Sequence, residues 1–286
     1  MTVPSEEVDS SEHGGPPGPV PTTCPCGMAN KNMPRIIAGE EAKENEFPWA
    51  AILTWRVEGV SQFCGGSLIT SAHVLTAAHC VVSKPSSSVS VILGDHDYTR
   101  ESSPYRKRVD VKEIVIHEKY SLYKHYDIAL LVLEQEVQLT RFISLVCLPS
   151  RLLNLDHQYL TAMGWGRVGW TDKDYPSVFL KKMRVRAVPL EECSHYASVN
   201  TTDPHQLCTY GSRKGLGQGD SGGPVVWRDP DINRYTIVGL PSFVYPFVHQ
   251  NLLPDVCTDV STLLSWIHSN LERTNPRTPA CWSTRT

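Results

Sequence analysis

Three short segments of the chain together contain the residue types of a nucleophilic catalytic site. They read TAAHC at residues 76–80, DIALL at residues 127–131 and GDSGGP at residues 219–224. A serine hydroxyl is a weak nucleophile at neutral pH and needs a neighbouring base, a role that suits histidine because its pKa lies near neutrality. A carboxylate then fixes the histidine tautomer and stabilises the imidazolium. The segments therefore predict Ser221 as nucleophile, His79 as base and Asp127 as the orienting carboxylate.

The elements that must position these residues have the pattern of β-strands. Short apolar runs recur between turn residues at 47–57, 63–69, 89–93, 109–116, 128–133, 180–188, 224–227 and 235–240. Many short strands with such punctuation predict an all-β sandwich or barrel. One helix is expected near the end, because Val260, Leu263, Leu264, Ile267 and Leu271 recur at helical spacing. Residues 1 to about 23 are polar, proline-rich and without periodicity, which predicts a disordered segment.

Composition excludes several classes of function. The 286 residues carry a formal net charge of −3, which argues against a nucleic-acid binder because phosphate backbones attract clustered lysine and arginine. No apolar stretch approaches the ~18 to 20 residues of a membrane span. The nine cysteines are mostly dispersed, which suits disulfides formed in an oxidising compartment, so we expect a secreted protein. The opening residues contain no signal peptide, and we therefore expect the true N-terminus to be missing.

The order His79, Asp127, Ser221 and the TAAHC and GDSGGP motifs resemble those of the chymotrypsin-like serine proteases, from residue 36 to about residue 273. This resemblance implies two packed six-stranded antiparallel β-barrels with a C-terminal α-helix, an all-β fold with the active site between the barrels. It divides the chain into a disordered N-terminal segment with the activation peptide (1–35), a protease domain (36–273) and a C-terminal tail (274–286).

The same resemblance implies a secreted endopeptidase that hydrolyses peptide bonds through an acyl-enzyme on Ser221. The main-chain N–H groups of Gly219 and Ser221 would form the oxyanion hole, because glycine lets the backbone turn and aim such groups at one point. The family implies protein or peptide substrates and inhibitors of the serpin type. It implies no cofactor, while the charge and the short apolar runs described above argue against nucleic acid and against a membrane span.

The family also implies activation by proteolysis. Arg35 and Ile36 resemble its cleavage site, where an activating protease frees a new amino terminus. The ammonium of Ile36 would enter the interior and pair with Asp220, because a buried carboxylate needs such a partner. This pairing would order the pocket and the oxyanion hole. Ala38 replaces the usual glycine near this site, so we expect slightly poorer activation. The chain as given is therefore expected to be a zymogen.

The resemblance assigns three disulfides: Cys64–Cys80, Cys26–Cys147 and Cys193–Cys208. Three cysteines remain, and Cys24 is expected to reach either Cys281 or a lost upstream domain. The Cys-x-Cys-Gly opening of the N-terminal segment resembles arthropod secreted proteases with an additional N-terminal module.

Asn200 begins the sequon Asn-Thr-Thr and is a predicted glycosylation site in a surface loop. We expect no metal, because Asp95 could start the family's calcium loop but Arg106 lies near its closing position.

The specificity pocket departs from the trypsin-like pattern. Gly215 stands where trypsin-like enzymes carry an aspartate, Ser242 and Val244 occupy one wall, and Asp255 replaces a glycine on the far wall. Asp255 could supply the missing negative charge and favour cleavage after arginine or lysine, since a buried carboxylate needs a partner. It could instead pair with Arg213 or Lys214 and fill the pocket, while Val244 would favour small aliphatic residues.

Two functions of different class remain open from the sequence. One is the serine endopeptidase zymogen described above. The other is a protease homologue with little turnover that acts as a regulatory binding protein, because a fold does not determine a function. The altered pocket favours the second, and so does the odd number of cysteines, which leaves at least one thiol free or paired with another chain. The intact triad favours the first.

Overall fold

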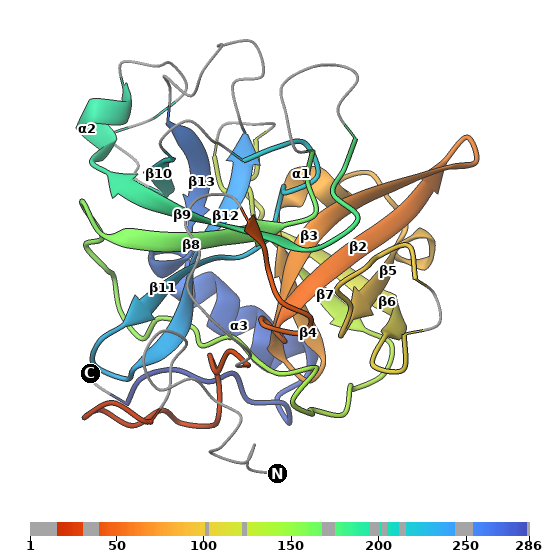
Figure 1. Ribbon diagram of the computed structural model, residues 1–286, viewed down its shortest axis with the longest axis horizontal. Helices are drawn as coiled ribbons and strands as arrows, with labels where there is room; N and C mark the ends of the chain where they lie inside the picture. Colours follow the sequence, from red (N-terminus) through yellow and green to blue (C-terminus); the bar gives the residue numbers. More distant parts are fainter. Residues whose placement is uncertain are drawn as a thin grey trace.

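The structure is a computed structural model that describes residues 16–30, 40–100, 103–121, 125–167, 175–194, 199, 201, 205–211, 216–243 and 254–284. Five of the predicted site residues lie outside this part of the chain: Arg35, Ile36, Asn200, Gly215 and Val244. All other predicted site residues are described. Figure 1 shows the two β-rich halves of the molecule side by side, with the last helix behind them.

The first half is a closed six-stranded barrel. Its strands are β2 (Ala50–Val57), β3 (Val60–Thr70), β4 (His73–Thr76), β5 (Ser90–Leu93), β6 (Lys107–Ile116) and β7 (Ala129–Leu133). They pair in the order β2-β3-β4-β7-β6-β5. The β2–β3 hairpin turns on Glu58 and Gly59, which both have positive φ (49° and 81°), as tight two-residue hairpin turns require. Leu53, Leu68 and Leu131 belong to the buried cluster that this barrel encloses.

The second half is also a closed barrel. Its strands are β8 (Tyr159–Gly164), β9 (Lys181–Val188), β10 (Gln206–Tyr210), β11 (Val225–Asp229), β12 (Arg234–Phe243) and β13 (Asp255–Asp259). The order is β9-β10-β13-β12-β11-β8, and a β8–β9 pairing closes the ring, while the short β1 (Glu40–Glu41) adds to β9. Every pairing in the two barrels is antiparallel. The predicted fold of two six-stranded antiparallel barrels is therefore confirmed.

Helices are few and short in the described residues. They are α1 (Ala78–Val81), α2 (Leu190–Cys193) and α3 (Leu264–Thr274), with 3₁₀ turns η2 (Ser86–Ser88) and η4 (Val260–Thr262). The helix expected from the apolar spacing is α3, and its first part is the separate turn η4. Asp259 begins that turn, because its Oδ1 accepts a hydrogen bond from Ser261 N. Ile267 and Leu271 of α3 are buried in a cluster that contains residues of both barrels.

No helix among the described residues has both the length and the apolar character needed to cross a lipid bilayer.

The N-terminal segment differs from the disorder expected of it. Residues 16–30 lie against the second barrel and the C-terminal tail, where Gly18 N donates to Ile232 O (2.9 Å) and Thr23 N donates to Trp282 O (2.9 Å). Cys26 and Cys281 are buried. Two disulfides join this segment to distant parts of the chain, Cys24–Cys281 and Cys26–Cys147. Covalent tethers thus order a proline-rich segment that composition alone predicts to be unstructured.

A buried histidine joins the first barrel to the C-terminal helix. His73 is fully buried; its Nδ1 lies 2.6 Å from Thr70 Oγ1 and its Nε2 lies 2.8 Å from Thr274 Oγ1. Thr274 Oγ1 donates its own proton to Asn270 O (2.6 Å), so His73 Nε2 must be the donor in its contact with Thr274. Burial lowers the pKa of His73 to about 4, against weaker opposing effects of Glu113 and Glu136.

This pKa predicts a pH-dependent stability. Between about pH 6.5 and pH 4 the unfolded chain protonates His73 while the folded chain does not, so the free energy of unfolding falls as the pH falls through that window. Lowering the pKa of His73 from its ordinary value to about 4 corresponds to about 3 kcal/mol of unfolding free energy. Urea unfolding of the wild type and of His73→Gln at pH 7, 6, 5 and 4 measures it. The difference between the two proteins should shrink by about that amount, and a difference independent of pH would contradict the assignment.

Candidate active site

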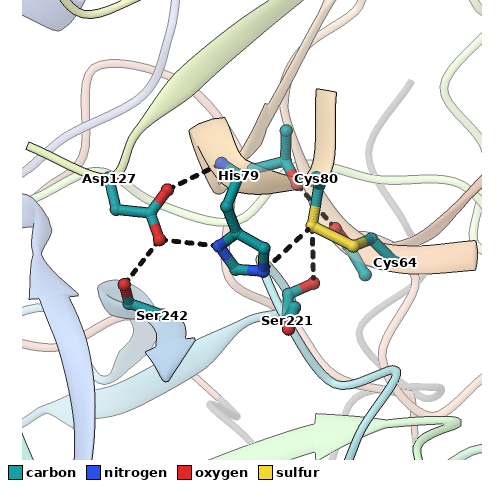
Figure 2. Close-up of a disulfide and its surroundings, with 8 residues drawn as sticks. Cys64, His79, Cys80, Asp127, Ser221 and Ser242 are labelled. Atoms are coloured by element: carbon teal, nitrogen blue, oxygen red, sulfur yellow. Dashed lines mark hydrogen bonds and ion pairs between the residues drawn. A yellow bond between two sulfur atoms is a disulfide. The ribbon is translucent and has the colours of Figure 1, made fainter. Parts of the chain in front are cut away.

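His79 and Asp127 meet at one edge of the first barrel. Strands β4 and β7 are antiparallel partners with Thr76 opposite Ala129. His79 follows the end of β4, in α1, and Asp127 precedes the start of β7, so both leave the barrel at the same edge. His79 Nδ1 lies 2.7 Å from Asp127 Oδ2, and His79 N donates to Asp127 Oδ1 (2.8 Å). The carboxylate thus holds both the ring and the main chain of the histidine (Figure 2).

The second barrel also holds Asp127. Ser242, near the end of β12, donates its hydroxyl to Asp127 Oδ2, and Thr258 of β13 donates to the main-chain oxygen of Asp127 (2.8 Å). Asp127 is only 2% exposed, so these bonds replace water around it. Sequence reasoning placed Ser242 on the pocket wall; in the structure its hydroxyl orients the carboxylate. Thr258 was missed, because nothing in the local sequence distinguishes it from other strand threonines.

Ser221 lies in a loop whose backbone conformation and close packing against the first barrel require glycine at neighbouring positions. Gly222 has a positive φ (71°), and a Cβ there would collide with Thr76 Oγ1. Gly65 and Gly223 are in backbone contact, since a Cβ on Gly65 would meet Gly223 Cα. Gly65 N donates to Ser221 O (2.8 Å), which fixes the nucleophile segment of the second barrel against β3 of the first. The glycines of GDSGGP therefore serve close packing as well as turning.

A disulfide lies beside both the histidine and the serine. Cys64 and Cys80 are joined, and Cys80 Sγ lies 3.7 Å from His79 Nε2 and 3.6 Å from Ser221 O, as Figure 2 shows. A disulfide sulfur carries no hydrogen, so the contact with Ser221 O is one of packing. These two sulfurs and His79 are the one group with metal-ligand spacing in the described residues. Because both sulfurs are used in the disulfide, the group offers no thiolate to a metal.

The loop before Ser221 presents two main-chain donors. Gly219 has φ 105°, a conformation that side chains rarely adopt. Neither Gly219 N nor Ser221 N donates a hydrogen bond to another described residue. Two such N–H groups beside a nucleophile can stabilise a developing oxyanion.

Asp220 is half-buried, and its carboxylate is held by two main-chain groups. Gly166 N donates to its Oδ1 (2.7 Å) and Gly217 N donates to its Oδ2 (2.8 Å). A Cβ at Gly164 or Gly166 would collide with this carboxylate. Burial raises the pKa of Asp220, and the two N–H groups lower it by less. No ion pair to Asp220 forms within the described part of the chain. Sequence reasoning found Asp220 but not its glycine partners.

Asp255 is the described acid of the predicted pocket. It is buried, and Leu216 N donates to its Oδ2 (3.0 Å). Burial raises the pKa of Asp255 to about 7; the Leu216 bond opposes this and the nearby Asp220 adds to it. The alternative partners Arg213 and Lys214 lie outside the described residues, as do the pocket residues Gly215 and Val244.

The remaining predicted sites are the disulfides and the loop at Asp95. Four disulfides join Cys24–Cys281, Cys26–Cys147, Cys64–Cys80 and Cys193–Cys208, which include the three assigned by resemblance. Cys257 is a buried free thiol, and burial raises its pKa. Arg106 Nη1 lies 2.8 Å from Asp95 Oδ2, so a guanidinium occupies the place beside Asp95 where a cation would sit.

The chain is similar to known serine proteases along most of its length. The family described as Trypsin matches residues 36–267. A venom serine protease of Polistes dominula is 32% identical over 77% of this chain and 79% of its own length. The CLIP domain-containing serine protease HP8 of Bombyx mori is 32% identical over 91% and 75%, and the proclotting enzyme of Tachypleus tridentatus is 30% identical over 90% and 72%. The chain therefore belongs to the trypsin family of serine proteases.

Proposed function

We propose that the protein is a secreted serine endopeptidase made as a zymogen. The proposal rests chiefly on one observation, the buried Asp127 carboxylate that holds His79 by both its ring and its main chain. A carboxylate in that place keeps the Nδ1–H tautomer and leaves Nε2 to take a proton from a nucleophile. Ser221 lies against the disulfide that also contacts Nε2. Such a constellation is required for turnover and has no role in a binding scaffold.

The reaction follows from these residues. His79 Nε2 accepts the proton of the Ser221 hydroxyl as its oxygen attacks the carbonyl carbon of the substrate. The oxyanion that forms is stabilised by the N–H groups of Gly219 and Ser221. The imidazolium, stabilised by Asp127, then gives its proton to the leaving amine, and water hydrolyses the acyl-enzyme with His79 as base.

Activation is proposed to follow cleavage after Arg35. The ammonium of Ile36 would pair with Asp220, whose raised pKa reflects burial without a cation. An ion pair there would fix the loop that carries Gly219 and Ser221. Relatives named for clotting and as CLIP-domain proteases support a place in an extracellular proteolytic cascade, with an activating protease, protein substrates and serpin-type inhibitors. Asn200 would carry a glycan in that compartment.

Cleavage after arginine or lysine is proposed to depend on Asp255. Asp255→Gly should lower kcat/KM for arginine and lysine substrates by about 100-fold, because a charge-assisted hydrogen bond in a buried site contributes ~1.5–3 kcal/mol. Substrates with alanine or valine should lose little. Because the pKa of Asp255 is about 7, the wild-type preference for basic residues should rise from pH 6 to pH 8 as the carboxyl ionises. A peptide library profiled at both pH values measures this; a preference for alanine or valine at both would assign specificity to Val244 instead.

An assay of peptide cleavage distinguishes an enzyme from a binding scaffold. It uses the chain cut after Arg35, with the new terminus at Ile36 confirmed by amino-terminal sequencing. Cleavage of the library that is lost in Ser221→Ala supports the endopeptidase. A serine-directed phosphonylating probe gives a second readout that does not depend on finding the right substrate. Absence of both Ser221-dependent cleavage and probe reaction would favour the regulatory binding protein.

A further inference from the structure

A cluster of aromatic rings surrounds Tyr126, the residue before Asp127. The Tyr126 ring has its centroid 4.5 Å from that of His117 and 4.4 Å from that of His205. His117 in turn lies 5.2 Å from Trp266. Lys119 Nζ lies 5.4 Å from the centre of the Tyr126 ring. Tyr126 is therefore the ring that contacts both histidines, and it is the residue immediately before the catalytic carboxylate.

The cluster joins elements that are far apart in sequence. His117 directly follows β6 of the first barrel, and His205 directly precedes β10 of the second. Trp266 belongs to α3, and its indole N–H donates to Glu118 Oε1 (3.4 Å). Through Tyr126, the main chain at Asp127 is packed against both barrels.

Hydrogen bonds fix the orientation of both histidine rings. His117 Nδ1 accepts a bond from Lys119 N (3.1 Å), which requires that nitrogen to be unprotonated. Thr262 Oγ1 donates its proton to Asp259 O (2.8 Å), so it must accept one from His205 Nδ1, 2.9 Å away. Burial lowers the pKa of His117, and His205 and Lys119 lower it further against the opposing charge of Glu118. Hydrogen bonds that do not involve Tyr126 thus hold both rings in place.

The backbone of Tyr126 turns these ring contacts into a constraint on Asp127. Tyr126 has φ 52°, a left-handed conformation that bulky residues adopt only when their surroundings enforce it. Its carbonyl accepts a bond from Ile128 N (2.8 Å), which closes a tight turn around Asp127. On the other side, Thr258 holds the Asp127 carbonyl. A rotation at Tyr126 would swing the carboxylate away from His79.

We propose that Tyr126 is a positioning residue for the triad: its ring, packed on His117 and His205, holds the main chain at Asp127 so that the carboxylate meets His79 Nδ1. This inference rests on the proposed function for its kinetic consequence, but its structural consequence can be observed without turnover. It assigns a role to ring packing and none to the phenolic hydroxyl.

The test compares two substitutions of the same residue in the full chain. Tyr126→Asn removes the ring but tolerates the left-handed backbone, whereas Tyr126→Phe keeps the ring. In chain cut after Arg35, the asparagine variant should lose between about 10-fold and 100-fold in kcat with KM changed less than twofold, because small displacements of a catalytic group have effects of this size. The phenylalanine variant should retain wild-type kcat.

A second readout follows the hydrogen bond itself. In ¹⁵N-histidine-labelled chain carrying Ser221→Ala, the Nδ1 proton of His79 should exchange with water at least tenfold faster in Tyr126→Asn than with tyrosine or phenylalanine at 126. If the asparagine variant does not fold, His205→Ala removes one ring contact and should accelerate this exchange about threefold. Unchanged exchange in a folded asparagine variant, or equal loss in both Tyr126 variants, would overturn the inference. An inactive wild type with ring-dependent exchange would instead reject the proposed function and leave the inference standing.

Discussion

Asp127→Asn is expected to lower kcat by about 10⁴-fold in the activated chain. Three donors converge on this carboxylate, namely His79 N, His79 Nδ1 and the Ser242 hydroxyl. An asparagine offers one accepting oxygen and one NH₂ group, so at least one donor loses its partner and the histidine is driven to the wrong tautomer. Steady-state kinetics of the cut variant measure the loss.

The control for this substitution is Asp110→Asn. Asp110 also accepts a hydroxyl bond, from Ser90 (2.9 Å), but on strand β6 away from the triad. The kcat of the Asp110→Asn variant should equal that of the wild type. A fall of less than tenfold in Asp127→Asn would mean that the carboxylate does not orient the base, and the proposed mechanism would have to be abandoned.

Asp220→Asn is expected to block activation, with kcat/KM of the cut chain reduced by about 10²-fold to 10³-fold. Asparagine cannot accept from both Gly166 N and Gly217 N, and it carries no charge for the ammonium of Ile36. Removing one partner of a buried ion pair costs ~3–5 kcal/mol. Active-site titration of chain whose Ile36 terminus has been verified gives the fraction of competent sites.

Cleavage at Arg35 should proceed normally in this variant, so a loss of activity reports the later step. Asp229→Asn is the matched control, because burial also raises the pKa of Asp229 but the residue ends β11, outside the activation loop. More than a tenth of wild-type activity in cut Asp220→Asn would show that the loop is ordered without the ion pair.

The sequence predicts the catalytic residues better than it predicts the residues that orient them. TAAHC, DIALL and GDSGGP name the triad because the reaction demands those residue types. The strand pattern predicts an all-β sandwich or barrel, and the family resemblance carried by these motifs implies two barrels. The supporting contacts depend on which side chains meet across the barrels. Ser242 and Thr258 lie 115 and 131 residues from Asp127, so no local pattern records their role. The ring packing of Tyr126 is hidden from the sequence for the same reason, since His117 follows β6 and His205 precedes β10, far apart in the chain.

Composition also misjudged residues 16–30 of the N-terminal segment, for a physical reason. A stretch rich in proline and glycine buries little apolar surface by itself, which predicts disorder. Here the order of residues 16–30 comes from two cystine bridges and from main-chain hydrogen bonds with Asp231, Ile232, Tyr235 and residues 282–284. The composition of the segment predicts neither the disulfide partner of Cys24 nor the distant main-chain groups that bond to the segment.

Those two bridges also give the molecule a covalent topology of two fused rings. Residues 26–147 form one ring, which contains every strand of the first barrel, and residues 147–281 form the other, closed by the tripeptide Cys24-Pro25-Cys26 around the second barrel. A cut after Arg35 opens the first ring and leaves the second intact. Activation would therefore restore chain entropy to the unfolded state of the first barrel alone. The second ring, which carries Ser221, keeps both bridges, and the N-terminal segment stays covalently attached to it.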